Sequence, residues 1–387
     1  MWILWAGVLL CSSSYTMAVP FLPLFLFDLG VKDGSINLWA GIVHASAFLV
    51  GAIMAPLWGS VADKYGKRKM VIRAGISLAI IYALLAFVRN PWELIVVRLL
   101  HGFVGGFVPA SMAIVASVAP KKEMGWSLGM MQAGTMTGGI LGPLFGGLLA
   151  SVFGLRMSFI VAGGIIFIAT MAVLIWVQEG KQAAPVKKSG GMLQEFALIF
   201  RSRLLLNLLL LLLVFQVSSN MIQPLITLHV ANLQGDLQDA VLTSGFVLAL
   251  IGIAGIIASP LWGRLGEKKG YTKILQVCLL IGGAVISLQY FVHSLWVFGI
   301  VQFVFGLFVA GIAPAVNTLV VRATDEEFRG RSFGLTASAN QFGGTIGPLI
   351  GGGLGLFVGI HWIFVASGLL LILAGIAVSR KGMLVRG

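Results

Sequence analysis

Hydrophobic residues fill most of the chain in long runs, and short polar breaks separate them. A helix needs about 20 apolar residues to cross a bilayer core of roughly 30 Å. Twelve runs are long enough, and we expect each to form a transmembrane helix. They cover about residues 3–27, 36–60, 70–88, 92–118, 126–152, 157–177, 204–230, 240–262, 274–292, 295–321, 332–356 and 360–379.

One polar break is much longer than the others and separates the first six spans from the last six. It covers residues 179–203, and its Lys, Gly and Pro content is typical of a linker. We therefore expect an N-terminal six-helix bundle over 1–178 and a C-terminal six-helix bundle over 204–387, joined by a basic cytoplasmic linker. The predicted fold class is an all-α polytopic membrane protein.

Composition supports a membrane protein and excludes a soluble one. Hydrophobic residues make up 58% of the 387 positions and charged residues 10%, against roughly 25% charged residues in soluble domains. The net charge of +13 does not indicate nucleic-acid binding, because all but four of the 26 Lys and Arg lie in alternate breaks or at the C-terminus. This asymmetry orients spans with positive loops inside. It predicts cytoplasmic termini in a plasma membrane, which we expect to be a bacterial inner membrane.

The two predicted bundles repeat one another. The segment PLWGSVADKYGKRK starts at Pro56 and PLWGRLGEKKGYTK starts at Pro260, 204 positions later. Farther along, GGILGPLFGG at 138–147 matches GGTIGPLIGG at 343–352. Two six-span halves that enter the membrane from the same side are parallel repeats, as in secondary transporters with a substrate site at the repeat interface near the midplane.

Three motifs resemble the major facilitator superfamily, and specifically the 12-span drug:proton antiporters of the bacterial multidrug-resistance group. The first is a signature in the loop between spans two and three, within the repeated segment that starts at Pro56. The second is Arg98 followed by Gly102, which resembles the motif of span four. The span-five antiporter motif comprises Gly129, Gly138, Gly142, Pro143, Gly146 and Gly147. The resemblance implies proton-coupled efflux of amphipathic drugs or toxic compounds by alternating access. We expect a monomer without cofactor that interacts with the lipid bilayer, a small-molecule substrate and protons.

The loop 2–3 signature is predicted to act as a conformational latch, which the resemblance assigns to stabilisation of the outward-open state. Its first copy comprises Gly59, Asp63, Lys64, Gly66, Lys67 and Arg68, and its second comprises Gly263, Glu267, Lys268 and Gly270. In the second copy Tyr271 and Thr272 replace two of the cations, so we expect a weaker latch. The alternative is a basic anchor that only orients the protein at the anionic membrane surface.

Glycines recur every fourth residue in span five, and span eleven repeats the pattern with Gly343, Gly347 and Gly351. Pro348 lies in the adjacent row of span eleven, as Pro143 does in span five. Small residues at this spacing let helices approach closely in lipid. Helix packing alone explains the pattern. The functional alternative adds a bendable interface between the halves.

Arg98 is the strongest candidate for a proton-coupling residue, because a charge inside a span marks a functional site by default. We predict that Asp28, Arg98, His101 and His44 form the proton-responsive set, since no Asp or Glu lies at a span centre. Imidazoles titrate near neutral pH. A snorkelling arginine and hydrogen-bonded structural histidines remain alternatives.

Polar residues within spans are candidates for the substrate cavity. They are Tyr15, Gln132, Gln216, Asn220, Gln223, Asn317, Asn340 and Gln341. A same-fold exporter of sugars, amino acids or other small metabolites is the first alternative function. A channel or an intramembrane enzyme is the second, but the sequence offers neither a filter loop nor catalytic or metal-binding clusters, and we expect no enzyme activity.

Overall fold

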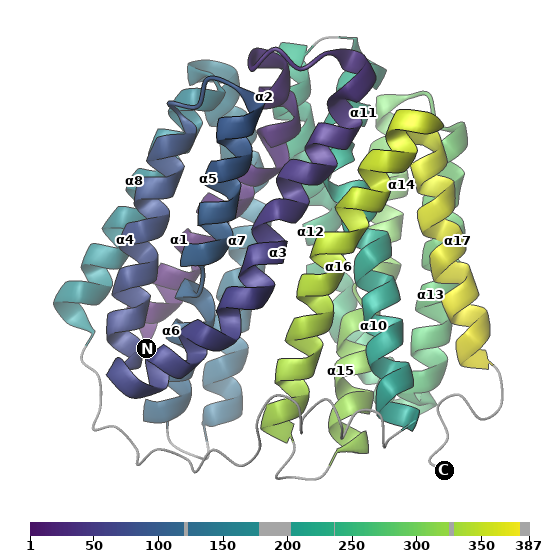
Figure 1. Ribbon diagram of the computed structural model, residues 1–387. Coiled ribbons are helices and arrows are strands. Elements are labelled where there is room, and N and C mark those ends of the chain that lie inside the picture. Colours follow the sequence, from purple (N-terminus) through teal and green to yellow (C-terminus); the bar gives the residue numbers. More distant parts are fainter. Residues whose placement is uncertain (120–122, 178–202, 236, 325–328, 380–387) are drawn as a thin grey trace. The chain divides into compact units, whose positions relative to one another are not determined.

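The structure is a computed structural model that describes residues 1–119, 123–177, 203–235, 237–324 and 329–379 (Figure 1). Within these residues the regular elements are all helices. They form two compact units. Unit 1 holds the described residues up to Val177 together with Val230–Ala249, and unit 2 holds Arg203–His229 and the described residues from Leu250 onward.

The first six spans form most of unit 1. Its elements are α1 (Trp2–Ala18), η1 (Val19–Phe21), α2 (Leu22–Asp28), α3 (Asp33–Tyr65), α4 (Lys67–Leu85), α5 (Pro91–Val104), α6 (Phe107–Val118), α7 (Met124–Phe153) and α8 (Leu155–Trp176). The central helix α1 packs against α7 and α8, while α4 packs against α8 and α3 against α5.

The last six spans supply α10 (Arg203–Ile222), η2 (Gln223–Leu225), α11 (Ile226–Gln234), α12 (Leu237–Lys269), α13 (Tyr271–Leu288), η3 (Gln289–Phe291), α14 (Leu295–Val309), α15 (Ile312–Ala323), α16 (Arg329–Phe357) and α17 (Ile360–Ser379). In unit 2, α10 packs against α16 and α13 against α17. These pairs correspond to α1 with α7 and α4 with α8, so the sequence repeat extends to the packing.

Eleven of the predicted spans are long and apolar enough in the described residues to cross a membrane. The helix α16 covers the remaining predicted span at 332–356, and its many Gly residues with Asn340 and Gln341 lower its hydropathy. Large apolar side chains such as Trp296, 83% exposed, and Phe87, 69% exposed, lie on the surface. Lipid is the solvent that suits such a surface.

Four predicted spans are interrupted rather than continuous helices. The first breaks at η1, which contains Pro20, and the seventh breaks at η2, which contains Pro224. The fourth breaks between α5 and α6 at Gly106, whose φ of 121° only glycine adopts readily. The tenth breaks between α14 and α15 at Gly311. The breaks again occur at corresponding positions of the repeat.

The predicted bundle boundaries remain a prediction. The linker at 179–203 lies outside the described residues except for Arg203. The segment Val230–Ala249, which includes most of α11 and the start of α12, clusters with unit 1.

Candidate functional site: a buried arginine centre

The local sequence of α5 places Arg98 on a buried face. The helix starts at Pro91, and the side chain of Asn90 accepts a hydrogen bond from the Glu93 backbone N–H, which caps the first turn. Its buried residues are Leu94, Arg98, His101 and Gly102. Because these positions are spaced by three or four residues, they share one helix face, and the arginine points into unit 1.

Arg98 is completely buried and makes one hydrogen bond. Its Nε donates to the backbone carbonyl of Val43 on α3 at 3.2 Å. Both Nη atoms are buried and have no hydrogen-bond partner. An arginine stays protonated in proteins, so a full positive charge lies inside the helix bundle.

Aromatic rings and imidazoles from three other helices surround this charge. The His101 ring contacts Tyr15 of α1 and Tyr82 of α4, with centroids 5.6 and 5.5 Å apart and the rings edge to face. The ring of His44 stacks on the ring of Phe48, with centroids 5.4 Å apart. His44, His101 and Tyr82 all lie close enough to Arg98 for electrostatic interaction. We call these residues, with Tyr15 and Arg98, the arginine centre.

Asp28, the fourth predicted coupling residue, does not join the arginine centre. It is exposed at the end of α2, and none of its described contacts leads to Arg98. The other carboxylates with described side chains, Glu93, Glu123, Asp239 and Glu267, are also exposed. Within the described side chains, therefore, no carboxylate neutralises Arg98.

The break between α5 and α6 lies two turns beyond Arg98, and side chains of α3 and α4 hold it. Trp58 Nε1 donates to the Phe103 carbonyl at 2.6 Å. Arg73 donates to the Gly105 carbonyl at 3.0 Å, and its guanidinium lies 3.5 Å from the centre of the Trp58 ring. These donors satisfy carbonyls that the interrupted helix leaves without partners.

The same arrangement occurs in unit 2. Trp262 Nε1 donates to the Leu307 carbonyl at 2.6 Å, next to the break between α14 and α15. Trp58 and Trp262 occupy the same position in the repeated segment, as do Phe103 and Leu307. Because both units share this hydrogen bond, we infer that the tryptophan of the repeated segment serves to support the helix break.

The first latch copy connects helix ends within unit 1. Gly66, with φ of 102°, joins α3 to α4. Lys67 Nζ donates to the Ala113 carbonyl of α6 at 3.3 Å, and Arg68 donates to the Leu174 carbonyl near the end of α8 at 2.5 Å. Leu174 lies in the last turn of α8, where a cation suits the negative end of the helix dipole. The side chain of Asp63 lies outside the described residues, and Lys64 lies 5.2 Å over the Tyr65 ring.

The second latch copy shares the turn but not these contacts. Gly270, with φ of 92°, joins α12 to α13, and Glu267 and Lys268 are exposed. At Gly59 and Gly263, the first residues of the two latch copies, the space where a Cβ would sit is open. Their small size is therefore not required by packing within the described residues.

The glycine rows of α7 and α16 pack within their own units. A Cβ on Gly138, Gly142 or Gly146 would overlap atoms of α1, and Thr16 donates to the Gly138 carbonyl at 3.0 Å. Gly343, Gly347 and Gly351 meet α10 in the same way. Gly147 instead lies against Val241 and Leu242 of α12, and Gly129 has open space. Pro143 and Pro348 lie inside continuous helices.

The predicted cavity residues divide between the units. In unit 2, Gln216 donates a hydrogen bond to Asn340, and Asn220 donates to the Gln216 carbonyl at 2.8 Å. Gln223, Asn317 and Gln341 are half-buried. In unit 1, Tyr15 belongs to the arginine centre and Gln132 is exposed on α7.

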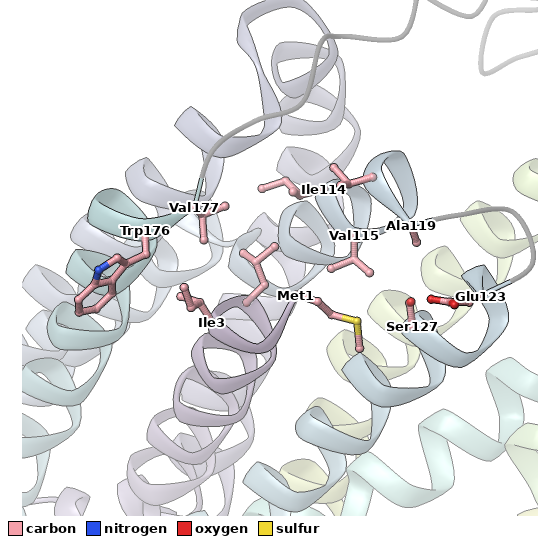
Figure 2. A pocket seen from close by; sticks show the side chains of 11 residues that line it. Met1, Ile3, Ile114, Val115, Ala119, Glu123, Ser127, Trp176 and Val177 are labelled. Atoms are coloured by element: carbon pink, nitrogen blue, oxygen red, sulfur yellow. The ribbon is translucent and has the colours of Figure 1, made fainter.

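A separate pocket of about 360 Å³ lies at the start of α1, between α6, α7 and α8 (Figure 2). Its lining is mostly apolar, with Met1, Ile114, Val115 and Val177 around it and Glu123 and Ser127 at one side. None of the predicted cavity residues lines this pocket.

Comparison with known proteins assigns the family. The family model described as Major Facilitator Superfamily matches residues 4–271 and 225–381. The chain belongs to the major facilitator superfamily. It is 32% identical over 385 residues to the multidrug resistance protein MdtG of Enterobacter lignolyticus. The matched region covers 98% of this chain and 92% of that relative. It is 33% identical over 365 residues to MdtG of Proteus mirabilis, covering 94% and 91%.

Solved structures with the superfamily fold resemble this member over nearly its whole length. The crystal structure of a bacterial homologue of the human lysosomal transporter Spinster, inward-facing and occupied, has a TM-score of 0.80 at 15% identity, covering 97% and 94% of the two chains. The nucleoside transporter NupG has a TM-score of 0.81 at 13% identity, covering 97% of each. These likenesses confirm the predicted fold, and the MdtG relatives confirm the predicted resemblance to the bacterial multidrug-resistance group.

Two groups of residues in this superfamily member were missed from the sequence. Tyr82 carried no signal, because a tyrosine in an apolar run does not reveal what it faces. The second group is the histidines of the second half, which lie far apart in the sequence. The ring centroids of His229 and His361 are 5.1 Å apart, and those of His361 and His293 are 6.3 Å apart. They come from α11, the start of α17 and the turn before α14, and only the fold brings them together.

Proposed function

We propose that this protein is a secondary transporter that exports amphipathic compounds across a bacterial inner membrane in exchange for protons. The observation that carries the proposal is the similarity to MdtG multidrug resistance proteins over nearly the full chain. Binding and release occur by alternating access, and the chain performs no chemical conversion. Both termini lie in the cytoplasm, as the distribution of Lys and Arg indicates, and the protein works as a monomer.

The arginine centre is the proposed site of proton coupling. His44 and His101 are the imidazoles beside the buried charge of Arg98. Protonation of either ring adds a second positive charge next to Arg98, which favours the access state that hydrates the centre better. We exclude Asp28 from this set because it is exposed and has no described contact with Arg98.

The latch and the polar residues of unit 2 complete the proposal. Lys67 and Arg68 stabilise one access state through their bonds to backbone carbonyls of α6 and α8, and such bonds can break when the helices move. Gln216, Asn220 and Asn340 provide hydrogen-bonding groups for the exported compound.

Transport by purified protein in proteoliposomes tests the function. We expect a pH gradient to drive accumulation of several structurally unrelated amphipathic dyes, and an uncoupler that removes the gradient to abolish it. Protein-free liposomes provide the control. Accumulation of a single sugar or amino acid, with none of the dyes, would favour the metabolite exporter instead.

The exclusion of Asp28 has its own test in the same assay. Because Asp28 is exposed, we expect Asp28→Asn to retain pH-driven export. Loss of pH-driven export in this variant, with counterflow of substrate intact, would return Asp28 to the coupling set.

A further inference from the structure

The charge of Arg98 has no counter-charge among the described side chains. The guanidinium is fully buried, and its Nε is bonded to the Val43 carbonyl while Nη1 and Nη2 have no partner. All described carboxylate side chains are exposed. A buried charge is strongly destabilising unless it is paired or hydrogen-bonded. The carbonyl bond satisfies one donor and supplies no charge.

Other buried polar groups of the arginine centre are also suited to an anion. The Tyr82 hydroxyl is buried without a hydrogen-bond partner, as are Nε2 of His44 and Nδ1 of His101. A hydroxyl can always donate, and an imidazole donates from one nitrogen when neutral and from both when protonated. These three residues are at most 9% exposed and come from three helices. The centre thus combines one permanent cation with uncommitted donors and no described anion.

We propose that the arginine centre binds a monovalent anionic group, either a small inorganic anion or the carboxylate of an exported compound. The two Nη groups of an arginine can hold a carboxylate with two parallel bonds or a halide between them. Tyr82 and a histidine then donate to the same anion. Binding is a property of the purified protein, so this inference stands or falls independently of the proposed export.

The aromatic side chains of the centre favour an amphipathic carboxylate among organic anions. The rings of Tyr15 and Tyr82 lie edge to face with the ring of His101. An aromatic acid can place its carboxylate on Arg98 and its ring edge against these side chains.

Equilibrium binding to the full-length protein in neutral detergent tests the proposal. The probes are sodium chloride, with ionic strength held constant, and 2-naphthoate, with neutral 2-naphthamide as a matched control of the same shape. We expect one or both anions to bind and 2-naphthamide to bind at least about tenfold more weakly. Chloride binding without 2-naphthoate binding assigns the site to inorganic anions, and preference for 2-naphthoate assigns it to carboxylates.

Variants locate the site. Arg98→Gln should weaken anion binding at least about tenfold, and Gln302 already occupies the corresponding buried position of the second half. Arg89→Gln removes an exposed arginine and should leave binding unchanged. Tyr82→Phe keeps the charge of Arg98 and the aromatic ring and removes only the hydroxyl donor. It should weaken anion binding several-fold, and it tests the site even if Arg98→Gln does not fold.

Three results would overturn the proposal. The first is no binding of either anion up to about 100 mM, far above the range expected for a charge-assisted bidentate contact. The second is equal affinity for 2-naphthoate and 2-naphthamide. The third is binding that Tyr82→Phe and a folded Arg98→Gln leave unchanged.

Discussion

At the scale of single residues, the indole of Trp58 supports the interrupted helix that follows Arg98. It bonds a carbonyl that the break between α5 and α6 would leave unsatisfied, and it forms the platform on which Arg73 rests. The repeat places Trp262 in the same role. These bonds connect the repeated segment to the helix that carries the arginine centre.

Replacing either tryptophan by phenylalanine should destabilise the protein. Trp58→Phe and Trp262→Phe keep an aromatic ring and remove one hydrogen bond, at a cost of about 1 kcal/mol each. The measurement is the thermal unfolding midpoint in detergent. Trp92→Phe is the control, because Trp92 is 69% exposed and no described hydrogen bond involves its indole. Equal midpoints for all three variants would contradict the assigned role.

His229 presents the opposite case, a buried polar residue whose hydrogen bonds are missing. The side chain is fully buried, and neither ring nitrogen has a hydrogen-bond partner. The ring centroids of Phe298 and Phe364 lie 4.8 and 5.0 Å from that of His229. An apolar ring of similar shape avoids the cost of burying unsatisfied polar atoms.

His229→Phe should therefore unfold at the same temperature as the natural protein or at a higher one. Circular dichroism during heating in detergent measures this. Phe298→Leu provides the comparison, since it removes a buried ring and should lower the midpoint. A clear fall for His229→Phe would show that the imidazole has a stabilising partner after all.

At the scale of elements, the glycine row of α7 sets the distance to α1. A Cβ added to Gly142 would overlap the backbone carbonyl of Ser13 and the side chain of Thr16, whereas a Cβ added to Gly139 would lie in open space. The two glycines lie on the same helix and differ in what they face.

Gly142→Ala should destabilise unit 1 by about 1–3 kcal/mol, because the added methyl overlaps α1. Gly139→Ala should be neutral or slightly stabilising, because alanine favours the helix. Unfolding midpoints of the two variants in the same detergent give the comparison. If Gly139→Ala were the more damaging variant, the assignment of the two faces would be wrong.

The sequence predicted the helices well and their interruptions poorly. Apolar length is a strong signal for a span, and the repeat is visible in the letters. Interruption is decided by packing: Pro56 and Pro143 lie inside continuous helices, while Pro20 interrupts one. Proline frees a backbone carbonyl in each case, and the sequence does not show which neighbours accommodate it.

The arginine centre was predicted in part. Arg98 and His101 share a helix face, and an intramembrane charge is visible in the sequence. His44, on another helix, belongs to the predicted set because imidazoles titrate near neutral pH. Tyr82 also comes from another helix, and its inward orientation could not be read because spans surrounded by lipid have no polar face to mark the outside. Asp28 was chosen as the carboxylate at the outer end of the first span, and the structure places it there, exposed at the end of α2 and away from the arginine centre.

At the scale of the whole molecule, duplication gives two units with the same helix pairs but different polar interiors. Unit 1 contains the buried Arg98, and its counterpart in unit 2 is Gln302, which bonds Gln289 at 3.3 Å. The charge is thus not needed to build the bundle. A residue that the fold does not require is a strong candidate for function.

The coupling role of Arg98 is tested by two transport modes measured on one preparation. Proteoliposomes containing the natural protein or Arg98→Gln are assayed for dye accumulation driven by a pH gradient and for counterflow of dye without a gradient. We expect Arg98→Gln to lose gradient-driven accumulation by at least about tenfold and to retain counterflow. Gradient-driven accumulation at the natural level in Arg98→Gln would contradict the coupling role.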